Sequence, residues 1–399
     1  MRAGSSDGPR VLVVLGNFAL NGQERGNIQV FSALKRVGVE SLFVTHADWG
    51  HRHLQPLLDR LGLQWTTLRY PRHFTKRLSQ RGWIGNIKQL LSASRAFGKL
   101  IHEYRPTHIH VANPHYFLGV LPALLMTRTP VVYRMGDEPP RHHVLYRWLW
   151  RWGIVPRVQA FVCVSEYVRE KAIAAGTPAH KTRVIYSHPP ERLEPESAPR
   201  DSFDGRTVAF VGQIAPHKGV DVLVEAAVKL CQSRDDVRFL IAGRITRQNL
   251  FGVGLHGKVQ ALGLADRIQF LNYVDDVPGL LAAAEVHVCP SVWEEPLSNT
   301  VVEAKQAGTP SVVFPSGGLP EIVEHERDGF VCRARTTEAL TEGVTFFLDA
   351  EVNELRAAGE AARASLKRLG VTREAFTESW LRVYGGAPDA VTHRATVDA

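Results

Sequence analysis

The chain has 399 residues, of which 44% are hydrophobic and 22% charged, and its formal net charge is +8. These values exclude a peptide hormone, a small disulfide scaffold and a disordered chain, and the length favours two domains of roughly 150–200 residues each. The charge is uneven, because residues 1–200 carry 28 Lys and Arg against 13 Asp and Glu, and the remainder carries 20 against 27. We therefore expect the two halves to meet different partners.

In the first half, short β-branched runs alternate with segments of helical period. Strands are predicted at residues 11–15, 42–45, 108–112, 131–133, 161–164 and 184–186. The apolar run at 11–20 resembles a signal-peptide core, but no A-x-A-like cleavage site follows and its β-branched residues indicate a buried strand. The longest apolar stretches fall short of the ~18–20 residues that a membrane-spanning helix needs.

The alternation stops at the polar, Pro-rich segment 187–206 and then resumes. Further strands are predicted at residues 208–211, 239–242, 268–271, 286–289 and 311–314. Near-continuous apolar strands separated by helices are typical of parallel sheets buried on both faces. The sequence therefore predicts an α/β fold with two doubly wound domains and a ligand cleft between them at the carboxyl ends of the strands.

The expected domain boundaries follow from this pattern. The first domain covers residues 1–190, a linker covers 191–206, and the second domain covers 207–370. A helix at about 371–385 is expected to pack back on the first domain, and residues 386–399 are expected to form a flexible tail. The four cysteines are far apart and form no C-x-x-C pair, which suggests no zinc site or disulfide framework and fits a reducing cytoplasm.

Two stretches of the first half lack acidic residues. Residues 60–102 contain nine basic residues, and residues 139–165 combine four arginines with Tyr146, Trp148, Trp150 and Trp152. A solvated face is the plain interpretation of any single charge run. Basic residues beside aromatic ones also suit an anionic membrane surface or single-stranded nucleic acid, and composition leaves both open.

Four segments could carry chemistry, of which Gly252–Gly257 satisfies G-x-G-x-x-G. A dinucleotide site is not expected there, because these glycines do not directly follow a strand. Residues 211–219 leave a strand and enter a helix near Val220, so glycine amides, a helix N-terminus and Lys218 together predict an anion site. A strand-to-helix turn with an exposed lysine is the plain alternative.

The segment 289–308 contains two glutamates, Glu295 and Glu303. Pro296 separates Glu295 from a helix that begins near Asn299 and ends at Gly308, so both carboxylates are expected to converge in front of the helix N-terminus. Thr300 and Glu303 also fit a capping box, and both interpretations stay open here. A Gly-Gly turn at 317–318 is another place where backbone can reach a ligand.

Taken in order, these motifs resemble the donor domain of glycosyltransferase family 4, whose members are retaining enzymes with the GT-B fold of two facing Rossmann-like domains. The matched landmarks are the segments 211–219, 241–243, 270–276, 290–303, 308–310 and 317–321. The first half resembles the acceptor domain less strongly, through Asn21-Gly-Gln-Glu-Arg25, where the family often has G-G-A-E-R.

The resemblance implies roles for several side chains. Lys218 would neutralise the donor diphosphate, Glu303 would hold the ribose hydroxyls and Glu295 would contact the transferred sugar. Backbone near Gly22, Leu297 and Ser298 would line the phosphates and the sugar, and the base would lie against Tyr273 and Val274. A lysine and helix N-termini can stabilise a leaving diphosphate, and no D-x-D motif occurs, so we expect neither a metal nor another cofactor.

Three departures from the family pattern stand out. Gln213 occupies a position where the family usually has arginine, so the site would rely on Lys218 or recruit Arg244. Leu297-Ser298 stands where Phe-Gly is common. Many members have a histidine near Gly136; here the nearest titratable substitute is Asp137, for which sugar contact, acceptor base and structural capping stay open. Other candidates that spacing cannot rank are His110, His115, His142 and His143.

The sequence thus predicts a cytoplasmic glycosyltransferase, peripheral on the membrane, that moves a hexose from a UDP- or GDP-sugar, GDP-mannose included, to a hydroxyl of a glycan or lipid-linked acceptor. Polysaccharide or glycolipid biosynthesis would follow, with the basic half docked on anionic lipid. One alternative is a nucleotide-sugar hydrolase or epimerase that uses the carboxylate pair. The other is a nucleic-acid-binding protein with steep salt dependence, although no known recognition motif is present.

Overall fold

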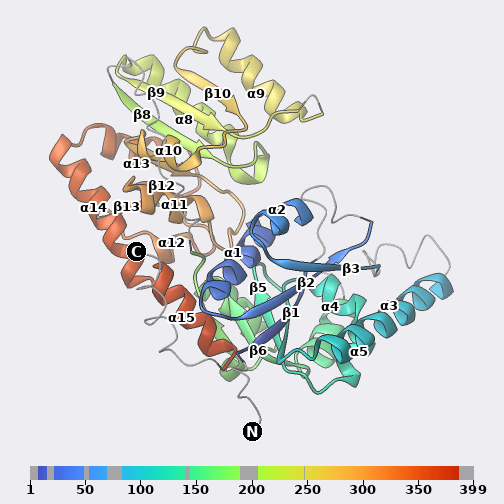
Figure 1. Ribbon diagram of the computed structural model, residues 1–399. Coiled ribbons are helices and arrows are strands. Elements are labelled where there is room, and N and C mark those ends of the chain that lie inside the picture. The colour runs from blue at the N-terminus through green and yellow to red at the C-terminus, as the bar shows by residue number, and fades with distance from the viewer. Residues whose placement is uncertain are drawn as a thin grey trace. The chain divides into compact units, whose positions relative to one another are not determined.

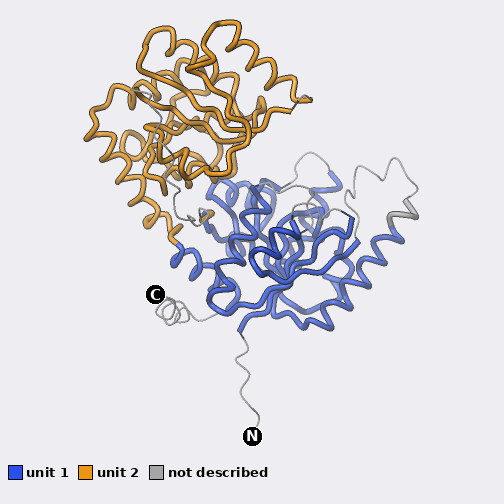
Figure 2. Tube along the Cα trace, turned by 45° about the horizontal axis from the view of Figure 1, so that its top comes forward, with its two compact units in different colours: residues 1–186, 373–399 blue, residues 187–372 orange. Residues whose placement is uncertain are grey.

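The computed structural model describes residues 8–15, 22–48, 54–69, 83–139, 144–188, 205–246 and 248–385. The chain forms two compact units, residues 1–186 with 373–399 and residues 187–372, which Figure 2 shows in different colours. Each unit contains one parallel sheet flanked by helices (Figure 1). The expected flexible tail and nearly all of the expected linker lie outside the described residues.

The first unit has a parallel sheet with the strand order β3-β2-β1-β4-β5-β6-β7. The described strands are β1 (Arg10–Val14), β2 (Glu40–His46), β3 (Gln64–Leu68), β4 (His108–Val111), β5 (Val131–Met135), β6 (Val158–Cys163) and β7 (Thr182–Val184). The described helices are α1 (Gly22–Arg36), α2 (Leu54–Arg60), α3 (Trp83–Tyr104), α4 (Pro114–Gly119), α5 (Leu121–Met126), α6 (Val144–Leu149), the π-helix η1 (Trp150–Ile154), α7 (Glu166–Ala174), the 3₁₀ turn η2 (Ala179–Lys181) and α15 (Arg373–Val383).

The helix α15 follows the second unit in sequence but packs on the first. Trp380 and Tyr384 are buried in the same cluster as Phe31 of α1. The hydroxyl of Tyr384 lies 2.7 Å from Nδ1 of His110, on β4. The chain therefore returns to the first unit after it completes the second.

The second unit has a parallel sheet with the order β10-β9-β8-β11-β12-β13. Its strands are β8 (Arg206–Val211), β9 (Val237–Ala242), β10 (Ile268–Asn272), β11 (Val286–Cys289), β12 (Ser311–Val313) and β13 (Gly329–Val331). Its helices are the 3₁₀ turn η3 (Pro216–Lys218), α8 (Val220–Ser233), α9 (Leu250–Ala261), α10 (Val277–Ala282), α11 (Asn299–Ala307), α12 (Leu319–Ile322), α13 (Thr337–Leu348) and α14 (Val352–Arg368).

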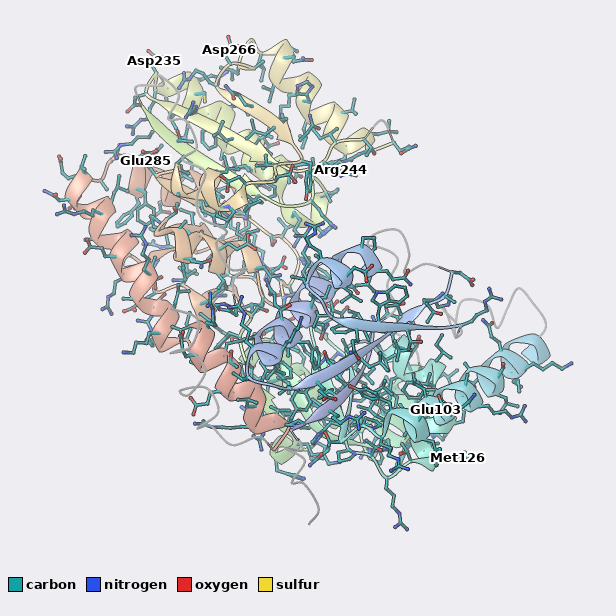
Figure 3. All side chains as sticks on the ribbon, viewed as in Figure 1. Glu103, Met126, Asp235, Arg244, Asp266 and Glu285 are labelled. Carbon is teal, nitrogen blue, oxygen red and sulfur yellow. The ribbon has the colours of Figure 1, made fainter. Side chains whose placement is uncertain are left out.

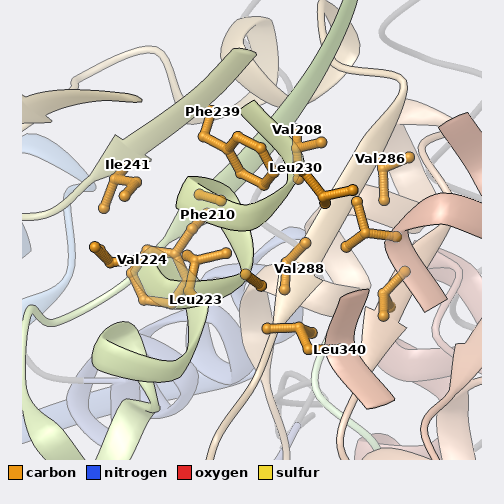
Figure 4. Close-up of a cluster of buried hydrophobic side chains, with 14 of the residues drawn as sticks. Val208, Phe210, Leu223, Val224, Leu230, Phe239, Ile241, Val286, Val288 and Leu340 are labelled. Carbon is orange, nitrogen blue, oxygen red and sulfur yellow. The ribbon is translucent and has the colours of Figure 1, made fainter. Parts of the chain in front are cut away.

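A contiguous apolar core holds the second sheet against its helices. In α8, Val220, Leu223, Val224 and Leu230 recur at helical spacing and are buried. They meet the inward side chains of the strands, such as Phe239, and Leu340 of α13 in one cluster (Figure 4). Because this core fixes the strands, it also fixes the loops that leave their carboxyl ends.

The predicted α/β class with two doubly wound parallel sheets is confirmed, whereas several element predictions need correction. The strands β3 and β13 were not expected, because β3 is a half-exposed edge strand and β13 has only three residues. The strand β7 covers 182–184 rather than 184–186. The interpretation of the G-x-G-x-x-G segment needs no correction, because the segment lies inside α9, where its glycines cannot form a phosphate-binding turn. Within the described parts of the chain, no helix is both long and apolar enough to cross a bilayer.

Candidate functional site

The strand order of the second unit defines where a ligand can bind. The chain runs outward from β8 through β9 to β10 and then returns to the other side of β8 with β11. In open parallel sheets, ligands bind at the carboxyl ends of the strands beside this switch point. The loops after β8 and β11, which carry Lys218 and Glu295, both leave the sheet there.

The loop after β8 is shaped by glycines. Gly243, after β9, approaches so closely that a Cβ there would lie 2.1 Å from the carbonyl oxygen of Gly212. Gly219 has a φ of +66° and precedes α8, and a Cβ at this position would lie 2.0 Å from the carbonyl oxygen of Pro290. Only glycine permits this packing, which brings Lys218 next to the loop after β11.

Glu295 lies at the centre of this edge. Its Oε2 accepts hydrogen bonds from Lys218 Nζ at 2.5 Å, from Ser291 Oγ at 2.9 Å and from the Trp293 indole at 3.4 Å. The residue is only 7% exposed. Its carboxylate is therefore largely removed from water but held by a cation and by neutral donors, as a buried charge requires. Burial and the neighbouring ammonium of Lys218 lower the pKa of His217.

A second set of contacts anchors the loop that carries Glu295. Arg335 donates to the carbonyl oxygens of Val292 at 2.9 Å and Pro315 at 2.8 Å, and it pairs with Glu294 Oε1 at 2.6 Å. Glu294 also accepts the amide of Gly317 at 2.7 Å. This guanidinium joins the loop after β11 to the loop after β12. The sequence predicted that backbone of the Gly-Gly turn could reach a ligand, but the Gly317 amide is already bonded to Glu294.

Glu303 lies inside α11, about one turn from its beginning, and is partly buried. The residue that precedes the helix is Ser298, whose side chain makes no capping hydrogen bond. Its hydroxyl lies instead 3.0 Å from Thr300 Oγ1. The capping-box interpretation of Thr300 and Glu303 is therefore wrong, because Thr300 is a helical residue rather than the cap.

The remaining expected donor residues of this unit lie along the same edge. Arg244 follows β9, and its guanidinium carbon lies 5.4 Å from the ring centroid of Tyr273, which follows β10. Figure 3 shows Arg244 on the opposite side of this unit from Asp235, Asp266 and Glu285, which each precede a strand. The other members are exposed Gln213, half-buried Val274 and Leu297, and buried Ser298.

In the first unit, the corresponding switch point lies between β1 and β4, and α1 begins beside it at Gly22. The Gln23 amide donates to the carbonyl of Ala112, directly after β4. Gly26 lies against Arg134 of β5, since a Cβ there would be 2.6 Å from Nη2. Burial lowers the pKa of this guanidinium to about 10, and the buried Glu24 carboxylate opposes the shift.

The candidate acceptor bases of this unit differ in burial and in hydrogen-bond partners. His110 is fully buried between Asn27 Oδ1, at 2.8 Å, and the Tyr384 hydroxyl, and burial lowers its pKa to about 3. It is a core residue, not an acceptor base. His115 bonds the Tyr146 hydroxyl at 2.7 Å, whereas Asp137 is exposed. His142 and His143 lie outside the described residues.

Sequence reasoning missed Arg335, Glu294, Ser291 and Trp293 as parts of the site. The last three lie within four residues of Glu295 in sequence, and polar residues around a loop carboxylate were the available signal. No local pattern marks Arg335. Among the described residues, no group of three or more His, Cys, Asp or Glu side chains is arranged to hold a metal ion. All four cysteines are buried free thiols.

Comparison with known proteins gives matches for both units. The family described as Glycosyltransferase Family 4 matches residues 20–187, and the family described as Glycosyl transferases group 1 matches residues 197–365. The phosphatidyl-myo-inositol mannosyltransferase of Mycobacterium leprae is 31% identical over 335 residues, which cover 71% of this chain and 88% of that protein. The putative glycosyltransferase YtcC of Bacillus subtilis is 31% identical over 198 residues, which cover 45% of this chain and 48% of that protein. This chain thus spans about half the length of the first curated relatives that it matches.

Solved structures share the fold. A glycosyltransferase from Rickettsia africae ESF-5 superposes with a TM-score of 0.80 at 19% identity and covers 97% of this chain and 99% of that chain. Anabaena Alr3699/HepE, solved in complex with UDP-glucose, gives a TM-score of 0.78 at 20% identity, with coverages of 94% and 99%.

Two Rossmann-like parallel-sheet domains, with these structural neighbours, define the GT-B class of proteins. The similarity to the mannosyltransferase over most of its length adds the family, and the chain belongs to glycosyltransferase family 4. Both predictions made from the sequence motifs, the family and the fold, are confirmed.

Proposed function

We propose that the protein transfers a hexose, with retention and without a metal, from a UDP- or GDP-sugar to a hydroxyl of a glycan or lipid-linked acceptor. The observation that carries this proposal is the Lys218–Glu295 ion pair at the switch point of the second sheet. Two names support the substrate class: the relative from M. leprae is a phosphatidyl-myo-inositol mannosyltransferase, and HepE was solved with UDP-glucose. Glycolipid or polysaccharide biosynthesis is the process we propose for this chain.

In the proposed complex, donor binding changes the partners of Lys218 and Glu295. A diphosphate offers Lys218 a stronger anionic partner and can also accept hydrogen bonds from the first amides of α8, which have no partner within the helix. Glu295 is then available to accept hydrogen bonds from sugar hydroxyls. We assign Glu303 to the ribose hydroxyls and Tyr273 and Val274 to the base.

The proposed reaction places the positive charge where the leaving group needs it. The bond between the sugar C1 and the diphosphate oxygen breaks while a bond from C1 to the acceptor oxygen forms on the same face, and the acceptor proton passes to the leaving diphosphate. Lys218 stabilises the charge that develops on that diphosphate. With Gln213 in place of the usual arginine, Arg244 is the proposed second cation.

Backbone groups and one further carboxylate supply the remaining proposed contacts. We assign the backbone near Gly22, together with that of Leu297 and Ser298, to the phosphates and the sugar. Asp137 is the proposed carboxylate for the acceptor or the sugar. Because Asp137 is exposed, the variant Asp137→Asn should fold normally and lower kcat without weakening nucleotide binding.

The experiment that tests the donor site is a thermal-shift panel of UDP, GDP, ADP and CDP with their common sugar forms, in the presence of EDTA. A donor at a hundred times its Kd adds about 2.7 kcal/mol of stability, enough to move Tm by several degrees. The variants Lys218→Ala and Glu303→Ala should lose this shift. The control variant Lys229→Ala, which removes an exposed lysine of α8, should keep it.

Three outcomes contradict the proposal in whole or in part. If no nucleotide raises Tm while an oligonucleotide binds with a steep salt dependence, the basic half defines a nucleic-acid-binding protein. If a nucleotide sugar binds but is hydrolysed at the same rate with and without acceptors, the protein is a hydrolase. A shift that requires a divalent cation instead overturns the metal-independent mechanism.

A further inference from the structure

The segment formed by α6 and η1, residues 144–154, has one apolar side packed into the first unit. Tyr146, Trp150 and Ile154, spaced four residues apart, are buried. The Tyr146 hydroxyl bonds His115, and the Trp150 indole donates to Thr177 Oγ1 at 3.2 Å. These contacts determine which side of the helical segment faces the interior and which side faces out.

The outer side of the same segment is also apolar. Val144 is 82% exposed, Trp148 58% and Trp152 64%, again at a spacing of four residues. A helix on the surface of a globular protein normally presents polar side chains to solvent. Two exposed tryptophans and a valine in one stripe therefore suggest that this side meets a less polar environment than water.

Arginines flank the outer stripe. Arg147 and Arg151 are exposed, and the guanidinium carbon of Arg151 lies 5.8 Å from the ring centroid of Trp152. Residues 104–136 and 139–165 contain no Asp or Glu. The exposed charged side chains that the described parts of these segments present are therefore basic.

The end of α5 extends this surface. Arg157, which follows η1, donates to the carbonyl oxygens of Leu124, Thr127 and Thr129, so the two helical ends lie side by side. Leu125 and Met126 at that end are exposed, and so is Arg128, which follows them. Figure 3 labels Met126 at the margin of the first unit. We refer to the exposed side chains of residues 125–128 and 144–152 as the docking surface.

We propose that the docking surface binds an anionic lipid bilayer. Tryptophan rings and arginines together favour the headgroup region, where the rings are buried and the guanidinium groups meet phosphates. The aliphatic side chains Val144, Leu125 and Met126 favour a bilayer over single-stranded nucleic acid, because they add apolar area but offer no flat face on which a base can stack. Like charge opposes a symmetric contact with a second copy, which would place arginines against arginines.

Bilayer binding by this surface does not depend on the proposed function. Only the additional role of presenting a lipid-linked acceptor rests on it. Its test therefore measures binding without turnover. Flotation of the full chain with vesicles of phosphatidylcholine alone, or with about 30% phosphatidylglycerol, gives the partition coefficient. Quenching of tryptophan fluorescence by brominated lipid reports whether Trp148 and Trp152 enter the headgroup region.

Binding should occur on the anionic vesicles and weaken as salt rises. The double variant Trp148→Ala, Trp152→Ala should lower partitioning at least about tenfold and abolish most of the quenching. Arg147→Glu with Arg151→Glu should lower partitioning by about 30-fold or more. The controls Val352→Ser and Arg356→Glu remove an exposed apolar and an exposed basic side chain of α14, and both should partition like the unmodified chain.

Three results would overturn the inference: no partitioning on anionic vesicles, equal partitioning of the tryptophan variant, or loss of a dimer in the tryptophan variant during analytical ultracentrifugation. Preferential binding of an oligonucleotide through the same residues would assign the surface to nucleic acid instead. The thermal shift with nucleotide sugars should persist in every docking-surface variant, so failure of this inference and failure of the donor proposal are distinguishable.

Discussion

Lys218 Nζ lies 2.5 Å from Glu295 Oε2, although 77 residues separate the two in sequence. The pair joins the loops that leave β8 and β11 at the switch point of the second sheet. A charge pair with only 23% and 10% of its side-chain surfaces exposed is screened little by solvent. The ligand-free protein therefore holds the two proposed donor-binding groups against each other, and under the proposed function an incoming anion would compete for the lysine.

Replacement of Glu295 by glutamine tests this competition. Because Lys218 is released, nucleoside diphosphate binding should be retained or strengthened by up to about tenfold. Because the sugar would lose its proposed carboxylate contact, kcat/KM should fall by about 10²–10³. Calorimetry with UDP and GDP, alongside initial rates with the donor from the thermal panel, separates the two effects. The exposed Glu338→Gln is the matched control. Equal losses of binding and rate would mean that the pair only ties the loops together.

Arg335 is a positioning residue, because it bonds two acceptors in the loop that carries Glu295 and ties that loop to Pro315 in the loop after β12. Lysine cannot reproduce a planar fork of donors, so Arg335→Lys should lower kcat about tenfold while the KM for donor changes less than about threefold. Arg335→Ala should lower kcat further and reduce Tm. The control Arg327→Ala removes an exposed ion pair on the same unit. A change in Tm with unaltered kcat would assign Arg335 a purely structural role.

Much of the fold could be predicted from sequence, because interior parallel strands are continuous apolar runs. The strand β11 has the predicted bounds, and α11 begins and ends where Pro296 and Gly308 suggested. The edge strands β3 and β13 could not be predicted in this way. β3 is half exposed, and β13 begins with Gly329, where a Cβ would lie 2.4 Å from the carbonyl oxygen of Ser311.

The site was predictable only as a set of loops. Lys218 and Glu295 each follow a strand, so their placement at the carboxyl edge could be inferred, but their direct contact depends on the tertiary packing of Gly219 against Pro290. Arg335 lies in no motif, and its role emerges only from the carbonyl oxygens around it. The spacing of His110 gave no indication that its ring is enclosed by Asn27 and Tyr384, which come from opposite ends of the chain.

Gly317 should be more sensitive to substitution than a left-handed glycine with open surroundings. It has a φ of +53°, and a Cβ would lie 2.1 Å from the carbonyl oxygen of Glu295. Gly263 has a φ of +69°, but a Cβ there would meet no atom of the described residues within 4 Å. Gly263→Ala should therefore cost about 1–2 kcal/mol from backbone strain alone. Gly317→Ala should cost at least about 3 kcal/mol and also lower kcat, as urea denaturation and initial rates would show. Similar losses in the free energy of unfolding at both positions would indicate that the loop after β11 moves to accommodate the added Cβ.

Two histidines that are fully buried within the described part of the chain predict a loss of stability in acid. Burial lowers the pKa of His110 and of His287 to about 3, against an ordinary value of 6.5. Between these two pKa values the unfolded chain binds protons at both histidines and the native chain does not. The free energy of unfolding therefore falls as pH drops from about 6.5 towards 3, by up to about 1.4 kcal/mol per pH unit for each histidine.

His287 Nδ1 lies 3.0 Å from Ser311 Oγ, a contact that asparagine can replace. His287→Asn should therefore flatten the pH dependence of unfolding of the second unit, measured by urea denaturation between about pH 4 and pH 7, while the dependence due to His110 persists. An unchanged slope in this variant would show that His287 becomes protonated without unfolding.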